Sequence, residues 1–112
     1  MRQIVPYQTP HFIIEGEGNI EPLLGLLVTD DAIEGSDEKY HTYPVLACGL
    51  ILDADTDDIN GGYGDLVTTY IRRGGSLYDK CLKYYIEVDG VVSDDVGFEN
   101  YCKTIGIPIA NF

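Results

Sequence analysis

The feature that most constrains this chain is an apolar block that opens directly onto a run of carboxylates. The block covers residues 45–52 (VLACGLIL), and four acids follow it within six residues: Asp53, Asp55, Asp57 and Asp58. A block of this length suits either a strand buried on both faces or a buried helix. We favour a strand, because the block is short and Pro44 precedes it at a position where a chain can enter a sheet. The four carboxylates repel one another, so the acidic half is expected to be exposed.

Charge narrows the classes of partner. The chain has 112 residues, with 19 acids against 7 bases and a net charge of −12. Residues 1–65 hold thirteen of the acids and two of the bases, whereas residues 66–112 hold six acids and five bases. Residues 1–65 therefore carry a net charge of −11, and residues 66–112 carry a net charge of −1. Nucleic acid and anionic membranes repel such a surface, so a direct ligand of either kind is not expected.

Length and cysteine usage indicate one cytoplasmic domain. A chain of this size with 45% hydrophobic residues can bury an ordinary core without disulfide bonds or a structural metal ion. Cys48, Cys81 and Cys102 form no CxxC pair and lie among apolar neighbours, so they are predicted to be reduced core residues. The start of the sequence shows no export signal, and no segment has the roughly 20 apolar residues of a membrane span.

The first half of the chain predicts strands. Residues 11–15 form a short apolar run closed by the turn-forming residues 16–19. Residues 23–28 form a second apolar run, for which a strand is favoured, although Asn19 as an N-cap and Pro22 in a first turn permit a short helix. Residues 30–43 show no regular spacing of apolar residues and are predicted to form a polar, acidic loop.

The second half predicts helices. Apolar residues recur at helical spacing over residues 59–71, and Gly74-Gly75 offers a C-cap. Ser76 is predicted to cap a second helix, with Leu77, Cys81, Tyr84, Tyr85 and Val88 on its core face. A third helix is predicted to start at residues 93–95 with a stripe of Phe98, Tyr101, Cys102 and Ile105, followed by an extended tail from Gly106. The predicted fold is α+β, a small sheet from the N-terminal half packed against about three helices from the C-terminal half.

Catalytic and metal sites are not indicated. Asp53, Asp55 and Asp57 match the first three ligand positions of a calcium loop, but Asp58 stands where the turn needs glycine and Gly64 where the bidentate Glu belongs. Neither His11 nor His41 lies near a Ser or Cys in a recognisable nucleophile setting. A small hydrolase using the carboxylates of residues 53–58 with a divalent metal would need ligands that the sequence does not display. No cofactor, metal or catalytic residue is therefore predicted.

A protein-binding surface fits the acidic half better. Tyr40 and Tyr43 flank His41 beside the acidic loop, and tyrosine gives contact area at low entropic cost, although ordinary packing explains these side chains equally well. The predicted partner-binding residues are Asp30, Asp31, Glu34, Asp37, Glu38, Tyr40, Tyr43, Asp53, Asp55, Asp57 and Asp58.

The order of these features resembles that of small acidic bacterial immunity proteins. Such proteins are encoded beside polymorphic or contact-dependent toxins and neutralise them. The resemblance covers roughly residues 22–92. It rests on short motifs: LLVTDD at residues 26–31, YPVLA at 43–47, GL at 49–50, DDI at 57–59 and YYIEVD at 84–89. It implies no catalytic residue. The expected function is a non-catalytic inhibitor of a basic toxin or nuclease, and the alternative is a phage-type DNA mimic that binds a host nucleic-acid-binding protein. The oligomeric state is left open.

Overall fold

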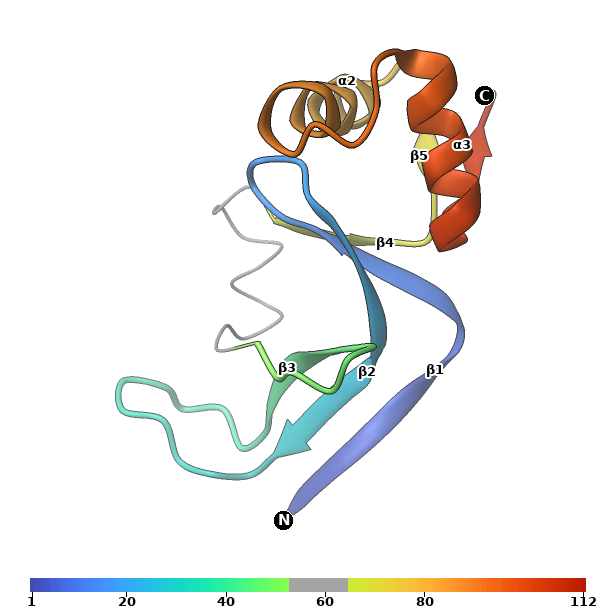
Figure 1. Ribbon diagram of the computed structural model, residues 1–112. Coiled ribbons are helices and arrows are strands. Elements are labelled where there is room, and N and C mark those ends of the chain that lie inside the picture. Colours follow the sequence, from blue (N-terminus) through green and yellow to red (C-terminus); the bar gives the residue numbers. More distant parts are fainter. Residues whose placement is uncertain (53–64) are drawn as a thin grey trace.

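The computed structural model describes residues 1–52 and 65–112. The elements in chain order are β1 (Arg2–Ile14), β2 (Ile20–Thr29), β3 (His41–Leu46), β4 (Leu66–Thr68), β5 (Ile71–Arg72), α2 (Ser76–Lys83), the π-helical turn η1 (Tyr84–Val88), α3 (Asp95–Ile105) and β6 (Ile109–Ala110) (Figure 1). The fold is α+β, as predicted: an antiparallel sheet is followed by two C-terminal helices.

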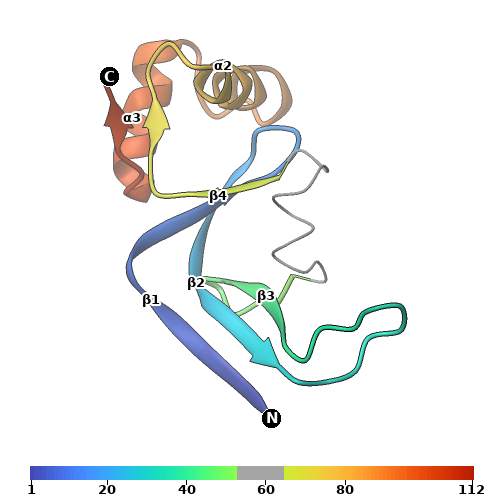
Figure 2. The ribbon, with the colours of Figure 1, turned by 180° about the vertical axis from the view of Figure 1, so that it is seen from behind.

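The main sheet has the order β3-β2-β1-β4, and β5 and β6 form a separate parallel pair. The molecule is elongated, with extents of 46 × 27 × 26 Å. Both helices lie at one end, over the tip of the β1–β2 hairpin, whereas β3 and the start of β1 lie at the other (Figures 1 and 2). We call residues 11–22 and 66–112 the helical end, and residues 1–10 and 23–52 the sheet end.

The helical end contains the larger core. The period of a strand sends Phe12 and Ile14 to the helix-covered face of the sheet, where both are buried. They join Ile20, Ile71, Tyr78, Cys81, Tyr85, Phe98, Cys102 and Ile107 in one cluster. The Tyr85 hydroxyl is satisfied there, because it accepts the Ile20 N–H at 2.9 Å and donates to Asn19 Oδ1 at 3.2 Å.

A smaller cluster lies on the opposite face of the sheet. Ile13 points there, between Phe12 and Ile14, and packs with Leu23 and Leu46. Farther along the sheet end Leu27 and Val45 are also buried, but Ile4 and Val5 of β1 and Leu24 of β2 remain 49%, 46% and 45% exposed. No described helix covers this part of the sheet (Figure 1).

Two glycines allow the chain to cross itself closely. A Cβ at Gly25, in the middle of β2, would lie 2.2 Å from the Val5 carbonyl oxygen, so only glycine lets β1 pass at this point. Gly18, at the tip of the hairpin, has φ +110°, and a Cβ there would lie 2.6 Å from the Lys80 carbonyl oxygen. The hairpin therefore abuts α2 with its backbone.

The prediction of a helix over residues 59–71 is wrong where the structure describes it, and with it the prediction of three helices. Residues 59–64 lie outside the described residues, but Leu66–Thr68 form β4 and Ile71–Arg72 form β5. The helical spacing was misleading because these short strands are selected by distant partners: β4 pairs with Phe12–Ile14, and β5 pairs with β6. Gly74-Gly75 consequently forms the turn into α2 rather than a C-cap.

The two later helices are close to their predictions. The N-cap of α2 is Gly75 rather than Ser76, and Asp94 caps α3 by accepting the Gly97 N–H at 2.8 Å. The stripe of α3 is confirmed, with Phe98 and Cys102 buried, and the tail is extended in β6. On the α2–η1 face Val88 is 64% exposed, because it lies in the last turn, beyond the core.

The strand predictions need two corrections. Residues 11–15 and 23–28 fall in β1 and β2 as predicted, apart from Glu15, but β1 starts nine residues earlier, at Arg2. The central strand lies earlier than predicted: β3 runs from His41 to Leu46, so residues 41–43 are strand rather than part of the predicted loop. Gly49, with φ +95°, then turns the chain so that Ile51 forms an isolated bridge to Val45. Cys48 lies in this turn and is exposed, so only Cys81 and Cys102 are core cysteines. Neither described helix is long and apolar enough to cross a membrane.

Candidate partner-binding surface

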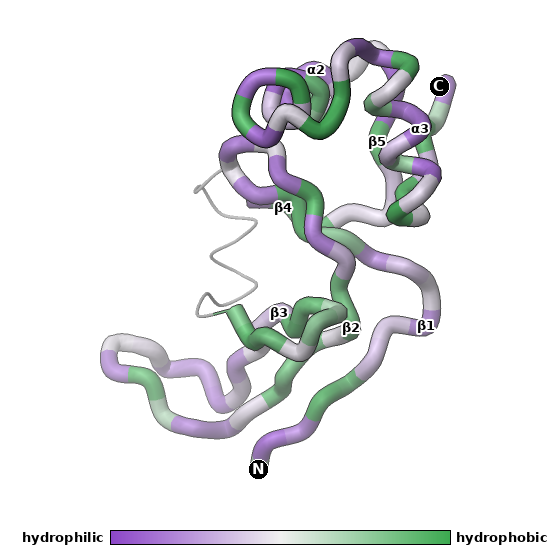
Figure 3. The backbone as a smooth tube through the Cα atoms, in the orientation of Figure 1, coloured by the Kyte–Doolittle hydropathy of each residue, from purple (hydrophilic) through white to green (hydrophobic). Residues whose placement is uncertain are grey.

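The acidic loop, residues 30–40, connects β2 to β3 at the sheet end. Every one of its residues is exposed, and it contains Asp30, Asp31, Glu34, Asp37 and Glu38. It projects away from both helices, and its path is mostly hydrophilic (Figures 1 and 3). Gly35 lies at its middle with φ +85°, and a Cβ added there would meet nothing within 4 Å. Five of the predicted partner-binding acids are thus brought together on one projecting segment.

The base of the acidic loop is neutralised by the start of β1. The amino group of Met1 lies 2.5 Å from Asp30 Oδ1, and this hydrogen bond lowers the pKa of the Asp30 carboxyl. Arg2 Nε lies 3.6 Å from Asp31 Oδ2, and the Asp31 N–H donates to Thr29 Oγ1 at 3.1 Å. These contacts fix the direction in which the loop leaves β2.

The outer part of the acidic loop keeps its charge. Within the part of the chain that the structure describes, Glu34, Asp37 and Glu38 form no ion pair. The loop's single base, Lys39, lies over the ring of Tyr40, with Nζ 5.2 Å from the ring centroid. Three uncompensated carboxylates on an exposed loop attract a cationic surface and repel an anionic one.

The two tyrosines predicted for this surface lie in different settings. Tyr40 ends the acidic loop and is 47% exposed, so its ring is available for contact. Tyr43 is half-buried on β3 and lines a hollow of about 370 Å³ together with Arg2, Leu27, Thr29, Asp31, Ile51 and Leu52. Asp31 belongs to both places, so the hollow borders the acidic loop.

The remaining predicted acids, Asp53, Asp55, Asp57 and Asp58, lie outside the described residues, as does the incomplete calcium pattern. Among residues 1–52 and 65–112, no group of three or more His, Cys, Asp or Glu side chains could hold a metal ion. His41 is buried in β3, and His11 stacks on Tyr7 with ring centroids 3.9 Å apart.

Sequence reasoning missed a second acidic surface, at the tip of the β1–β2 hairpin. It is formed by Glu15, Glu17, Glu21 and Asp65. Burial, followed by repulsion from Glu21 and Asp65, raises the pKa of the Glu15 carboxyl. Asp65 Oδ1 accepts the Gly16 N–H at 2.6 Å. The turn predicted at residues 16–19 could have placed Glu15 near Glu21, but the approach of Asp65 depends on the pairing of β4 with β1. The described acids of the first half therefore divide between two ends of the sheet.

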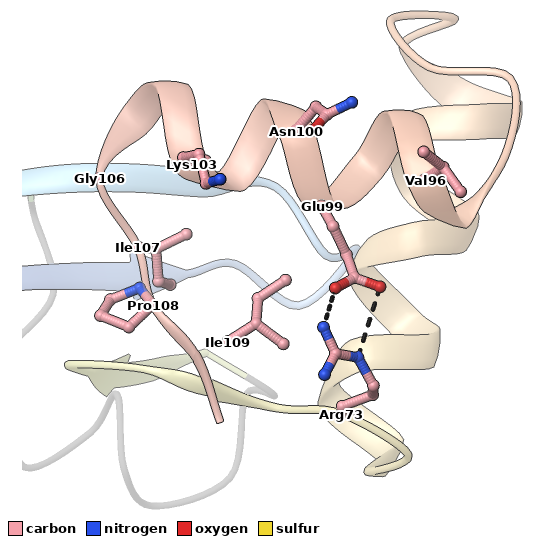
Figure 4. A pocket seen from close by; sticks show the side chains of 9 residues that line it. All are labelled: Arg73, Val96, Glu99, Asn100, Lys103, Gly106, Ile107, Pro108 and Ile109. Carbon is pink, nitrogen blue, oxygen red and sulfur yellow. Dashed lines mark hydrogen bonds and ion pairs between the residues drawn. The ribbon is translucent and has the colours of Figure 1, made fainter. Parts of the chain in front are cut away.

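A hollow of about 560 Å³ lies at the helical end and was also not predicted (Figure 4). Its polar wall is an ion pair between Arg73 and Glu99, and the Tyr78 hydroxyl donates to Glu99 Oε2 at 2.9 Å. The Arg73 hydrogen bond lowers the pKa of the Glu99 carboxyl, while burial and Glu99 raise the pKa of Tyr78 to about 12. These groups satisfy one another, so they join α2, α3 and the residue that follows β5, and Glu99 is not left as a free carboxylate.

No protein-family model matches the chain, and comparison with curated proteins and with solved structures finds no match.

Proposed function

We propose that this protein is a non-catalytic acidic binding protein that neutralises a basic toxin or nuclease by direct contact, in the manner of an immunity protein. The observation that carries the proposal is the state of the acidic loop: its outer carboxylates, those of Glu34, Asp37 and Glu38, are exposed and form no ion pair with a described residue. The resemblance of residues 22–92 to small bacterial immunity proteins points in the same direction.

We expect charge complementarity to select the partner. Nucleases and other nucleic-acid-binding toxins carry basic surfaces that contact phosphates. An exposed acidic loop can occupy such a surface, and complementary charge raises the association rate and disfavours partners of the wrong sign. Tyr40, 47% exposed beside these carboxylates, supplies aromatic contact area.

Two charge-neutralising variants test this proposal. The loop-neutral variant combines Glu34→Gln, Asp37→Asn and Glu38→Gln. The helix-neutral variant removes the same charge at the helical end through Asp79→Asn, Glu87→Gln and Asp89→Asn, all at exposed positions. Asp94 and Glu99 are unsuitable for this control, because Asp94 caps α3 and Glu99 binds Arg73.

The experiment is co-expression of each variant with a basic nuclease toxin, sought first among the genes that neighbour this chain's gene, measured as survival of the host cells. The parent and the helix-neutral variant should protect the cells, and the loop-neutral variant should protect them poorly. Protection by the loop-neutral variant equal to that by the parent would contradict the role of the loop. Failure of the parent to bind or neutralise the toxin, together with binding to a host DNA-binding protein, would favour a DNA mimic instead.

A further inference from the structure

One edge of the main sheet is open over most of β1. β4 pairs with β1 only at Phe12–Ile14, and β2 occupies the other edge of β1 from Arg2 onward. Within the described part of the chain, no strand pairs with the outer edge of residues 2–10. An unpaired edge presents a row of backbone donors and acceptors that can pair with another strand.

The register identifies the backbone groups that point outward. The Asp30 N–H donates to the Met1 carbonyl at 3.3 Å, and the pairs Arg2 with Thr29 through Pro6 with Gly25 continue this register without a shift. Because hydrogen-bonded pairs alternate along an antiparallel ladder, Arg2, Ile4 and Pro6 direct their backbone groups to the open edge. Pro6 lacks an N–H, and an outward position is where a strand tolerates proline.

The side chains along this edge include exposed apolar residues and no acids. Ile4 and Val5 are 49% and 46% exposed. The tube in Figure 3 shows a hydrophobic stretch near the start of β1. Residues 1–14 contain none of the chain's 19 acids. The two positive charges, the Met1 amino group and Arg2, are already paired with Asp30 and Asp31. This edge therefore offers no local attraction to a basic strand, and, because it carries no acid, a like-charged copy can approach it with little local repulsion.

We propose that the open edge of β1 pairs with the same edge of a second copy of this chain. In an antiparallel arrangement centred on Ile4, the two Ile4 residues exchange both backbone hydrogen bonds. Arg2 of each copy donates to the Pro6 carbonyl of the other. Pro6 limits the ladder to residues 2–6, and because the same edge is used by both copies, the assembly closes as a two-fold dimer. The two acidic loops lie at opposite ends of the joined edge, where salt screens their repulsion.

The test is sedimentation equilibrium of the full chain at micromolar to submillimolar concentrations. Ile4→Lys places two like charges opposite each other across the joined edge, and it should raise the dimer dissociation constant about tenfold or more. Leu24→Lys is the matched control, because Leu24 is 45% exposed but lies on β2, away from the edge. We expect the parent and Leu24→Lys to form dimers and Ile4→Lys to be monomeric.

Hydrogen exchange measured by NMR on the same samples locates the contact. The Ile4 amide should become protected as concentration rises, whereas the Val5 amide, which faces β2, should be protected at every concentration. A parent protein that is monomeric throughout, or a dimer that Ile4→Lys leaves intact, would overturn the proposal. Protection of Ile4 only after a basic protein is added would also overturn it, by assigning the edge to that partner.

Discussion

The two ends of the molecule differ in the size of their hydrophobic cores. At the helical end ten buried residues form one cluster, while the cluster on the other face of the sheet has three. Burial of apolar surface is the dominant favourable term in folding, so the helical end supplies most of the stability. The sheet end keeps exposed apolar residues, an open strand edge and an acidic loop. The difference suggests that one end maintains the fold while the other is free to bind.

Charge is also used differently at the two ends. At the helical end Glu99 is paired with Arg73, and Asp94 caps α3. In the outer part of the acidic loop, Glu34, Asp37 and Glu38 have no such role among the described residues. A carboxylate that caps a helix or pairs with arginine contributes to stability, whereas a solvated one contributes to long-range attraction.

The largest expected effect on stability is at the centre of the helical end. Tyr85→Ala removes a ring that is 1% exposed and leaves the Ile20 N–H without its partner. We expect a loss of about 3–5 kcal/mol in the free energy of unfolding, measured by urea denaturation. Tyr40→Ala, on the exposed acidic loop, should change it by less than about 0.5 kcal/mol. Equal losses for the two variants would contradict the division between the ends.

A smaller difference is expected between two glycines that both have positive φ. Gly18→Ala forces a Cβ against the Lys80 carbonyl oxygen at the hairpin–helix contact, whereas Gly35→Ala, in the acidic loop, meets nothing within 4 Å. The backbone conformation costs both variants about 1 kcal/mol, but Gly18→Ala should lose roughly a further 1–2 kcal/mol from the clash. The measurement is the urea midpoint of each variant. A Gly35→Ala variant as unstable as Gly18→Ala would mean that the loop is packed rather than free.

How far the sequence predicts this structure depends on how local each signal is. The helices that start near residues 76 and 95 and the strand over residues 23–28 follow from spacing and breakers, which neighbouring residues set. β4 and the early start of β1 could not be found in this way. β4 is short and forms only by pairing with Phe12–Ile14, far away in the sequence. Pro6 argues against a strand unless that strand is known to have an unpaired edge, which the sequence does not show. Likewise the acidic loop was predicted, but the contacts of Asp30 and Asp31 with the start of β1 require the fold.

Alkaline pH should weaken the helical end through its buried thiols. Burial raises the pKa of Cys81 and of Cys102 from 9.0 to about 12. The unfolded chain releases these protons above pH 9, whereas the folded protein retains them to about pH 12, so stability is full below pH 9 and falls between pH 9 and 12. Urea midpoints measured across this range should fall, and they should fall less in the double variant Cys81→Ala/Cys102→Ala. A midpoint that does not change with pH would contradict the burial of both thiols.

The same cysteines allow a comparison of accessibility. Cys48 is exposed in the turn after β3, whereas Cys81 and Cys102 are buried. At neutral pH a thiol reagent should therefore modify one cysteine rapidly and the other two only after unfolding by urea. Mass spectrometry of the labelled peptides identifies the sites. Rapid labelling of Cys102 in the native protein would show that the core of the helical end opens readily.

The most direct test of the division between the ends measures binding and stability on the same samples. The parent, the loop-neutral variant and the helix-neutral variant are compared by their urea midpoints and by their association rates with the same basic toxin at several salt concentrations. We expect unfolding free energies within about 0.5 kcal/mol of one another, and an association rate for the loop-neutral variant about tenfold lower, with a weaker dependence on salt. The helix-neutral variant should associate nearly as fast as the parent. Equal slowing in both variants, or a parent rate that ignores salt, would contradict the claim that the acidic loop captures the partner.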